Sequence, residues 1–238
     1  MKDSFQIKEI TTDIYLVTEP YFTGYANLFL IKGSSFDLLV DCGIGLFDIK
    51  KFLKSAGFPS VKVAVTHGHF DHIGGLTHFS GDEVFVTNEI AVNVRKRELG
   101  GLEFLKPEYF QPEFADVFGR GQLAEFCASF SPKFPPLGPY DQTEISVGNF
   151  QFEIIRVPGH TDDSIVLYEK KKKMLMSGDT LYDGEVYAGF SNSSKKDFKS
   201  SLQRISALDF ELVLPGHNSM LNKRQALGVI NRWTGQLK

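Results

Sequence analysis

The feature that most constrains this chain is a six-residue stretch at positions 67–72, which reads His-Gly-His-Phe-Asp-His. It directly follows an apolar run, residues 61–65, that predicts a buried strand, so its polar side chains are expected on the loop that leaves the strand. A lone histidine is more often a surface or packed residue, but three imidazoles and a carboxylate this close together are the ligand types of a metal site. Alternation along an extended loop points His67 and His69 the same way and sends the last two polar residues elsewhere. The motif therefore predicts two adjacent metal positions.

The composition bounds the remaining possibilities. The 238 residues are 42% hydrophobic with a formal charge of −3, which is typical of a soluble globular protein and offers no basic excess for nucleic acid. Residues 1–6 lack the apolar core of a signal peptide, and no run approaches the roughly 20 apolar residues that span a bilayer. We therefore expect a cytoplasmic protein without a membrane span, with Cys42 and Cys127 as free thiols. The oligomeric state is left open, and a homodimer is one option.

The order of the predicted elements indicates an α/β (α+β) architecture in one domain over residues 1–238. Strands that pair in hairpins come first in each half of the chain and helices follow, which favours two sheets face to face with helices outside. The predicted strands are 14–17, 25–31, 36–40, 61–65, 83–87, 144–147, 150–157, 165–168, 174–176 and 210–214, and the predicted helices are 46–56, 89–99, one that begins after 194–197, and 223–233.

Residues 100–142 interrupt this order with a segment dense in Phe, Pro and Gly. It is too irregular for a periodic assignment and too aromatic for a disordered linker. Long insertions of this kind are usually functional and often form lids, although a structural flap over the core is the alternative. With the loop 182–190 and its Tyr187, it is expected to form apolar substrate walls that favour an acyl chain.

Three further candidate ligands each follow an apolar strand and a glycine: His160, Asp179 and His217. Glycine lets the backbone turn sharply and approach its neighbours closely. The series His-x-His-x-Asp-His, Gly-His, Gly-Asp and Pro-Gly-His resembles the metallo-β-lactamase-fold superfamily over roughly residues 10–235.

This resemblance implies an αββα four-layer sandwich with a dinuclear metal centre at one edge of the sheets. It assigns His67, His69 and His160 to a first metal ion, Asp71, His72 and His217 to a second, and Asp179 to both. The expected cofactors are two Zn²⁺ ions, with Fe or Mn as alternatives. Two dications lower the pKa of a water between them from about 15.7 towards about 7, so a metal-bound hydroxide and hydrolysis are the expected chemistry.

Details of the motifs discriminate between branches of the superfamily. A bridging Asp179 argues against antibiotic hydrolysis, and His69 in place of a glutamate argues against the flavin-partnered diiron branch. The short spacing from Asp179 to His217 leaves no room for the inserted domain of the nucleases. Tyr182 lies three residues after Asp179, and in this spacing the chain is similar to quorum-lactone hydrolases, which have a tyrosine at the same place. The wider pattern resembles the acyl-CoA thioesterase, glyoxalase-II-like and lactonase branch.

The predicted function is therefore cleavage of a thioester, ester or lactone of a small acyl substrate. Asp71 is expected to orient the hydroxide and Tyr182 to hydrogen-bond the carbonyl or leaving group, unless Tyr182 is only a packed core residue. Alternatives are an iron-dependent sulfur (persulfide) dioxygenase, a β-lactamase-like enzyme and a non-catalytic metal-binding protein.

Three residues around the motifs carry secondary expectations. Asp41 lies at the end of the third predicted strand, where the resemblance to the superfamily implies an aspartate that orients a metal-bound histidine, with a surface turn as the alternative. Asp162 and Asp163 stand where many members of the superfamily have Pro-Gly. Their carboxylates are expected to disfavour a strongly anionic group near the site.

Overall fold

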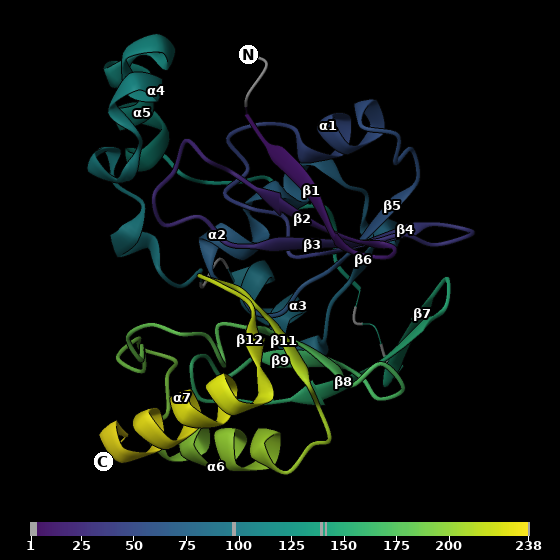
Figure 1. Cartoon of the computed structure of the whole chain (residues 1–238). Helices are drawn as coiled ribbons and strands as arrows, with labels where there is room; N and C mark the ends of the chain where they lie inside the picture. The colour runs from purple at the N-terminus through teal and green to yellow at the C-terminus, as the bar shows by residue number, and fades with distance from the viewer. Residues whose placement is uncertain (1–3, 97–98, 139, 141, 238) are drawn as a thin grey trace.

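Two six-stranded sheets form the centre of the computed structural model, which describes residues 4–96, 99–138, 140 and 142–237 (Figure 1). The first sheet has the order β1 (Gln6–Thr11), β2 (Ile14–Thr18), β3 (Leu28–Ile31), β4 (Asp37–Val40), β5 (Val61–Ala64) and β6 (Val84–Phe85). The second has the order β12 (Leu221–Asn222), β11 (Leu212–Pro215), β10 (Met174–Gly178), β9 (Ile165–Glu169), β8 (Phe150–Arg156) and β7 (Glu144–Val147). Neighbouring strands are antiparallel except for β4–β5, β5–β6 and β10–β11, which are parallel.

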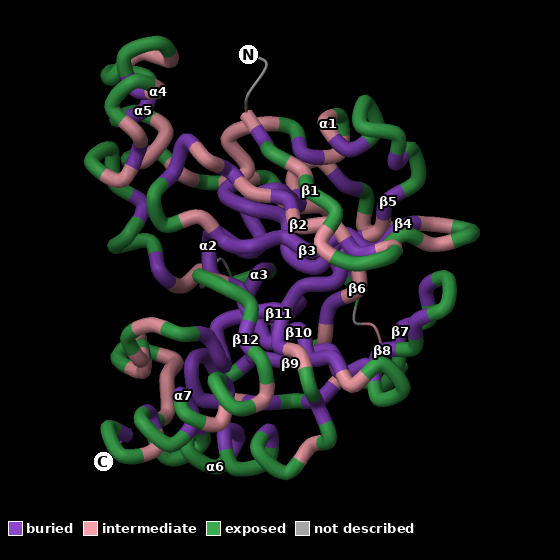
Figure 2. Tube along the Cα trace, in the orientation of Figure 1, coloured by how far each residue is buried: buried purple, intermediate pink, exposed green. Residues whose placement is uncertain are grey.

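Apolar side chains on both faces of each sheet create a four-layer sandwich. Leu38 and Val40 of the first sheet pack against Phe152, Leu167 and Met176 of the second, so one layer of core lies between the sheets. The outer faces are covered by α1 (Ile49–Ser55) and α3 (Asn88–Lys96) on the first sheet and by α6 (Lys195–Ser206) and α7 (Lys223–Gln236) on the second. The buried part of the chain accordingly runs through the middle of the molecule (Figure 2). The predicted αββα fold is confirmed.

The insertion differs from the sequence expectation because it is helical. It holds the 3-10 helices η3 (Leu102–Phe104) and η4 (Pro107–Tyr109) and the α-helices α4 (Pro112–Phe118) and α5 (Arg120–Ala128). A proline begins η4 and α4, where the missing N–H costs nothing. Gly119, at φ 105°, ends α4 and separates it from α5. Both α-helices are short, so their stability comes from tertiary packing rather than from a periodic pattern.

Two strands at sheet edges, the six-residue β1 and the two-residue β12, were not predicted, because edge strands bury few side chains. The end of the predicted helix 89–99, at Arg97 and Glu98, lies outside the described residues. In the described part of the chain, no helix has the length and apolarity to cross a membrane.

The parallel pairs place the candidate ligands. The carboxyl ends of β4 and β5 lead to Asp41 and His67, and those of β10 and β11 lead to Asp179 and His217. Because the ends of parallel neighbours lie at the same edge of a sheet, each pair delivers its polar residues to one place. The two sheets together therefore form a polar edge from segments far apart in the sequence.

Candidate metal centre

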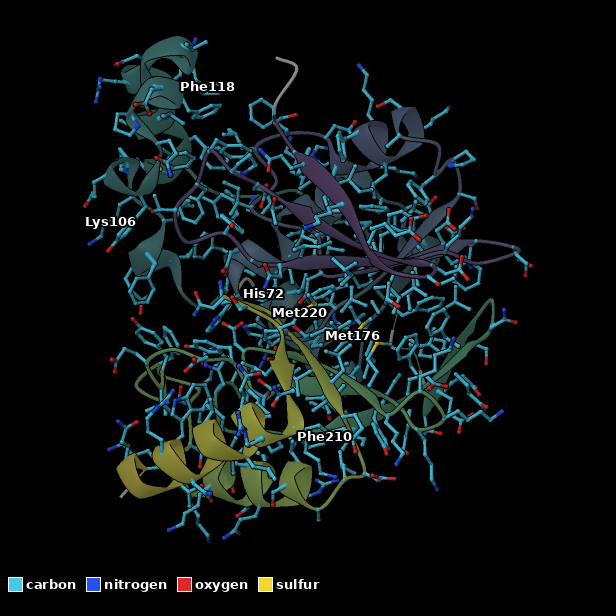
Figure 3. All side chains as sticks on the ribbon, viewed as in Figure 1. His72, Lys106, Phe118, Met176, Phe210 and Met220 are labelled. Carbon is cyan, nitrogen blue, oxygen red and sulfur yellow. The ribbon has the colours of Figure 1, made fainter. Side chains whose placement is uncertain are left out.

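All seven sequence-predicted ligands come together at this edge of the two sheets. They form a first group, His67, His69, His160 and Asp179, and a second group, Asp71, His72 and His217, and within each group the candidate ligand atoms lie within 4.8 Å of one another. Asp179 also faces the second group, with Oδ1 3.2 Å from His72 Nε2 and Oδ2 3.3 Å from His217 Nε2. Six of the seven side chains are buried and His217 is partly exposed. Figure 3 shows His72 at the boundary between the two sheets.

The motif itself spans two kinds of backbone. His67 lies on the loop after β5, and His69 is the extended residue at the start of α2 (Phe70–Ile73). The last two ligands of the motif, Asp71 and His72, lie within this helical turn rather than on an extended loop as predicted. The change from loop to helix turns their side chains away from the first pair, so the two pairs face different groups for another backbone reason than the predicted alternation.

Glycines next to the ligands allow close approach of other segments. A Cβ at Gly216 would lie 2.5 Å from Asp179 Oδ1, and one at Gly100 would lie 2.2 Å from the imidazole carbon Cδ2 of His69. Gly178 combines a φ of 48° with a position against Thr66, where a Cβ would lie 2.5 Å from Oγ1. Side chains at these positions would therefore displace the ligands or their supports.

In four of the histidines, Nδ1, the ring nitrogen that faces away from the ligand groups, is held by a hydrogen bond. His72 Nδ1–H donates to Asp41 Oδ2 at 2.7 Å, as the sequence predicted for Asp41. Thr66 Oγ1–H also donates to this carboxylate, which leaves its oxygen to accept from His67 Nδ1–H at 3.1 Å. His160 and His217 donate from Nδ1 to the backbone carbonyls of Tyr187 and Tyr25, at 2.9 and 3.1 Å.

The inner atoms left by this arrangement fit a metal ion. His67 Nε2, His72 Nε2 and Asp179 Oδ1 are buried and have no hydrogen-bond partner. Buried polar atoms are nearly always paired, so unpaired atoms that face one another are suited to bind a cation. His69 points the opposite nitrogen inward, with Nδ1 3.1 Å from His160 Nε2. Imidazole nitrogens and carboxylate oxygens are ligands of zinc and of iron alike.

Electrostatics divide the five histidines into two kinds. Burial lowers the pKa of His67, His69 and His160, that of His69 to about 3, so these imidazoles are neutral and ready to bind a metal. Burial alone would also lower the pKa of His72 and His217. The nearby carboxylates outweigh it and raise both, that of His217 to about 10. Positive charge is therefore favoured where the carboxylates converge.

The two carboxylates show the complementary effect. Burial alone would raise the pKa of Asp179, but His217 and His72 outweigh it and hold that pKa well below its usual range. Asp71 follows the same pattern, with His72 as its strongest neighbour. Both side chains are therefore anionic at neutral pH and suited to hold cations.

A cavity of about 830 Å³ opens onto the two groups and is largely aromatic. Phe104 of the insertion and Tyr187 meet across it with ring centroids 5.6 Å apart. Phe190 lies deeper, 4.5 Å from the imidazole of His69. The two walls that the sequence predicted, the insertion and the loop 182–190, thus both line the cavity and lead from the surface to the candidate ligands.

Tyr182 lines the cavity beside His217, with ring centroids 5.8 Å apart. Its hydroxyl donates to the backbone carbonyl of Glu185 at 2.6 Å. Burial raises the pKa of this phenol well above its ordinary value, so the hydroxyl keeps its proton and can act only as a donor or acceptor of hydrogen bonds.

Asp162 and Asp163, which are expected to disfavour a strongly anionic group near the site, are not among the residues that line the cavity. Asp163 points into the protein beneath the histidine loops, and Asp162 is exposed. Sequence reasoning also missed the supporting roles of Thr66 and of the Tyr187 carbonyl. Thr66 adjoins the motif and could have been found there, whereas a backbone carbonyl carries no sequence signal.

Comparison with known families agrees with this geometry. A family model described as the metallo-beta-lactamase superfamily matches residues 21–217. The chain belongs to this superfamily. Its recognition from the motif series, and the fold implied by it, are confirmed.

Relatives within the superfamily cover most of the chain. The acyl-coenzyme A thioesterase MBLAC2 of Gallus gallus is 33% identical over 238 residues, which covers 91% of this chain and 81% of that protein. The human protein of the same name is 29% identical and covers 88% of this chain and 80% of its own length. Among solved structures, a metallo-beta-lactamase from Pontibacter korlensis superposes with a TM-score of 0.70 at 16% identity and covers 98% of both chains, which shows a shared fold.

Proposed function

We propose that this superfamily hydrolase cleaves thioesters of small acyl substrates at a dinuclear metal centre that holds two zinc ions. The observation that carries the proposal is the pair of ligand groups that share Asp179 and open onto an aromatic cavity. The naming of the MBLAC2 relatives as acyl-coenzyme A thioesterases supports the choice of a thioester among the bonds that such a centre can break.

The site residues divide the work of hydrolysis. Bound metal ions would supply a water that is acidic enough to react near neutral pH and would polarise the carbonyl oxygen. Asp179 lies between the two groups and sets their separation. Asp71 faces the cavity, and its carboxylate accepts a hydrogen bond from the attacking water and orients it. As the water oxygen bonds to the carbonyl carbon, the C–S bond breaks, and a carboxylic acid and a thiol leave.

Tyr182 is proposed to donate its hydroxyl hydrogen to the carbonyl oxygen or to the leaving sulfur. In the structure this hydrogen is directed to the Glu185 carbonyl, so rotation about the phenolic C–O bond, or a shift of the loop 182–190, must redirect it. Because its pKa is raised, the phenol remains a donor over the whole working pH range.

The aromatic walls favour an apolar acyl group. Phe104, Tyr187 and Phe190 offer ring faces and edges rather than charges along the path to the metal ligands. Each buried methylene contributes about 0.8 kcal/mol to binding, so acyl chain length should be read out in KM.

A hydrolysis panel on protein of defined metal content tests this function. Acyl-coenzyme A, glutathione thioester, lactone and β-lactam substrates are compared on chain loaded with two zinc ions, and we expect thioester turnover to dominate. Protein stripped with a chelator serves as control and should lose activity and regain it with zinc. One iron per chain together with oxygen-dependent oxidation of a persulfide would instead support the sulfur dioxygenase alternative.

A further inference from the structure

Asp163 is a buried carboxylate that belongs to neither ligand group. Its side chain is 2% exposed, and it accepts a hydrogen bond from Thr161 Oγ1 at 2.6 Å. The backbone N–H of Gly68 lies against the same oxygen at 3.4 Å, and Asn93 Nδ2 donates to the other oxygen at 2.9 Å. Three neutral donors from three segments therefore converge on one side chain.

Two of these donors belong to the loops that carry the histidines of the first group. Gly68 lies between His67 and His69, and Thr161 directly follows His160. The third donor, Asn93, lies on α3, which packs against the first sheet. Asp163 thus ties the loop after β5 to the loop after β8 and anchors both to a rigid helix.

The fit at this junction is tight. A Cβ at Gly68 would lie 2.9 Å from Asp163 Oδ2, so the carboxylate occupies the space that the missing side chain leaves. Across the two loops, His160 Nε2 and His69 Nδ1 are only 3.1 Å apart. A zinc–nitrogen bond is about 2.0–2.1 Å long, so a small slip of one loop against the other would spoil the shared coordination geometry.

The second group has separate supports. His72 is held by Asp41 and by the N–H of Cys42, which donates to the His72 carbonyl at 2.8 Å, and His217 is held by the Tyr25 carbonyl. None of these hydrogen bonds involves Asp163. A change at position 163 should therefore reach the first group and leave the second group in place.

We propose that Asp163 is a positioning residue that locks the His67–His69 loop to the His160 loop and thereby sets the metal affinity of the first group. The inference rests on the metal centre of the proposed function but not on its substrate. Supports of metal ligands typically change metal affinity by about 10–100-fold when they are removed, and we expect a loss in this range.

Metal titration of variants tests the role of Asp163 without any activity assay. Asp163→Ala and Asp163→Asn are compared with Asp162→Asn, a matched control because the exposed Asp162 also accepts from Asn93, at 3.2 Å. Zinc affinities are measured by competition with a chelating dye, and Co²⁺ absorption spectra report the geometry. His160→Ala removes a candidate ligand of the first group and His217→Ala one of the second, so the metal-binding step lost in each variant is assigned to that group.

The expected result is selective. Asp163→Ala should weaken the step that His160→Ala removes by about 10–100-fold and leave the other step nearly unchanged. The zinc-free chain should still unfold cooperatively, at a lower temperature, because Thr161 and Asn93 lose an acceptor. Asp163→Asn should show a smaller loss, because its amide oxygen can still accept from Thr161 and Gly68 and only the contact with Asn93 is lost. Asp162→Asn should behave as the wild type.

Contrary outcomes separate the two proposals. Suppose that the wild-type protein binds two metal ions, but the Asp163 variants have unchanged affinity or lose affinity equally in both steps. This result overturns the role of Asp163 and leaves the dinuclear centre standing. If the wild-type chain binds a single ion, the dinuclear centre is refuted, and the role of Asp163 survives only if its removal still weakens that step while Asp162→Asn does not. A chain that binds no metal overturns both.

Discussion

Single side chains fix the orientation of the candidate ligands, and Asp41 shows how. It adopts φ 62°, a left-handed conformation that costs a residue other than glycine about 1–3 kcal/mol. Its buried carboxylate accepts from His72 Nδ1, Thr66 N and Thr66 Oγ1, which offsets that cost. The strain is retained because the turn delivers the carboxylate to the outer nitrogen of His72 and so directs Nε2 inward.

The role of Tyr182 is tested by Tyr182→Phe. The ring of Tyr182 packs on His217 and Trp233, so a substitution that removes only the hydroxyl oxygen leaves the cavity wall intact. Loss of a hydrogen bond made mainly in the transition state should lower kcat by about 10–100-fold, which corresponds to about 1.4–2.7 kcal/mol, while KM and metal content hold. Steady-state kinetics with thioester and ester substrates, together with metal analysis, measure this. Unchanged turnover on both substrate classes would remove the hydroxyl from the mechanism and leave Tyr182 as a packing residue.

At the level of elements, the insertion is anchored to the loop between β2 and β3. Phe22 and Phe110 form an isolated β-bridge, and Thr23 N–H donates to the Tyr109 carbonyl at 2.7 Å. Tyr21 stacks on Phe114, with ring centroids 4.8 Å apart. The anchored side of the insertion is therefore structural, whereas η3 at its start carries Phe104 into the cavity. The anchored part has the contacts expected of a structural flap, and the lid stays a prediction for the part around η3.

Phe104→Ala should alter selectivity for acyl chain length. Removal of this ring from the wall should raise KM for long-chain thioesters several-fold and leave short-chain substrates nearly unaffected, because only a long chain reaches the outer part of the cavity. KM and kcat measured over a series of chain lengths report the effect. Val117→Ala is the matched control, since this side chain of α4 is 78% exposed and lies outside the cavity lining. Equal losses on short and long substrates would argue against an acyl path along Phe104.

At the level of the whole molecule, Glu19 joins the loop between β2 and β3, on which the insertion is anchored, to the loop after β4. It is fully buried, its Oε1 accepts from the Tyr21 hydroxyl at 2.6 Å, and its Oε2 accepts from Ile44 N at 2.9 Å. Burial raises the pKa of Glu19 from 4.5 to about 7, although the two hydrogen bonds act in the opposite direction. The folded chain therefore holds this proton more tightly than the unfolded chain does.

This difference predicts a loss of stability as the pH rises. Between about pH 4.5 and about pH 7 the folded state binds more protons at Glu19 than the unfolded state, so the free energy of unfolding falls across that window. At about 1.4 kcal/mol per pKa unit, the effect is at most about 3–4 kcal/mol. Urea unfolding of zinc-loaded protein at pH 5 and pH 8 measures it.

Glu19→Gln isolates the contribution. The amide is neutral at both pH values, and it keeps two partners if the Tyr21 hydroxyl turns to accept. The free energy of unfolding of the variant minus that of the wild type should therefore be larger at pH 8 than at pH 5. Glu9→Gln, at an exposed position of β1, is the control and should show no such change. The same difference between Glu19→Gln and wild type at both pH values would contradict the raised pKa.

Local chemistry explains which features the sequence by itself determined. The His67–His72 motif, the glycines before His160, Asp179 and His217, and the alternating apolar strands are short-range signals, and they were enough to predict the ligands and the four layers. The glycines before His160, Asp179 and His217 are recognisable in the sequence because glycine lets the backbone turn sharply and approach its neighbours closely. The role of Asp41 was predicted from its place at the end of a strand together with the resemblance to the superfamily.

Only the tertiary structure decided how these parts support one another. Asp163 beneath the histidine loops, the Glu185 carbonyl on Tyr182 and the packing that makes the insertion helical all depend on segments that meet through the fold rather than along the chain. A hydrogen bond to a backbone carbonyl or a ring packed across two loops leaves no pattern in the sequence of either partner. The choice of candidate ligands therefore rested on local information. Their support and the shape of the cavity did not, because long-range contacts fix both.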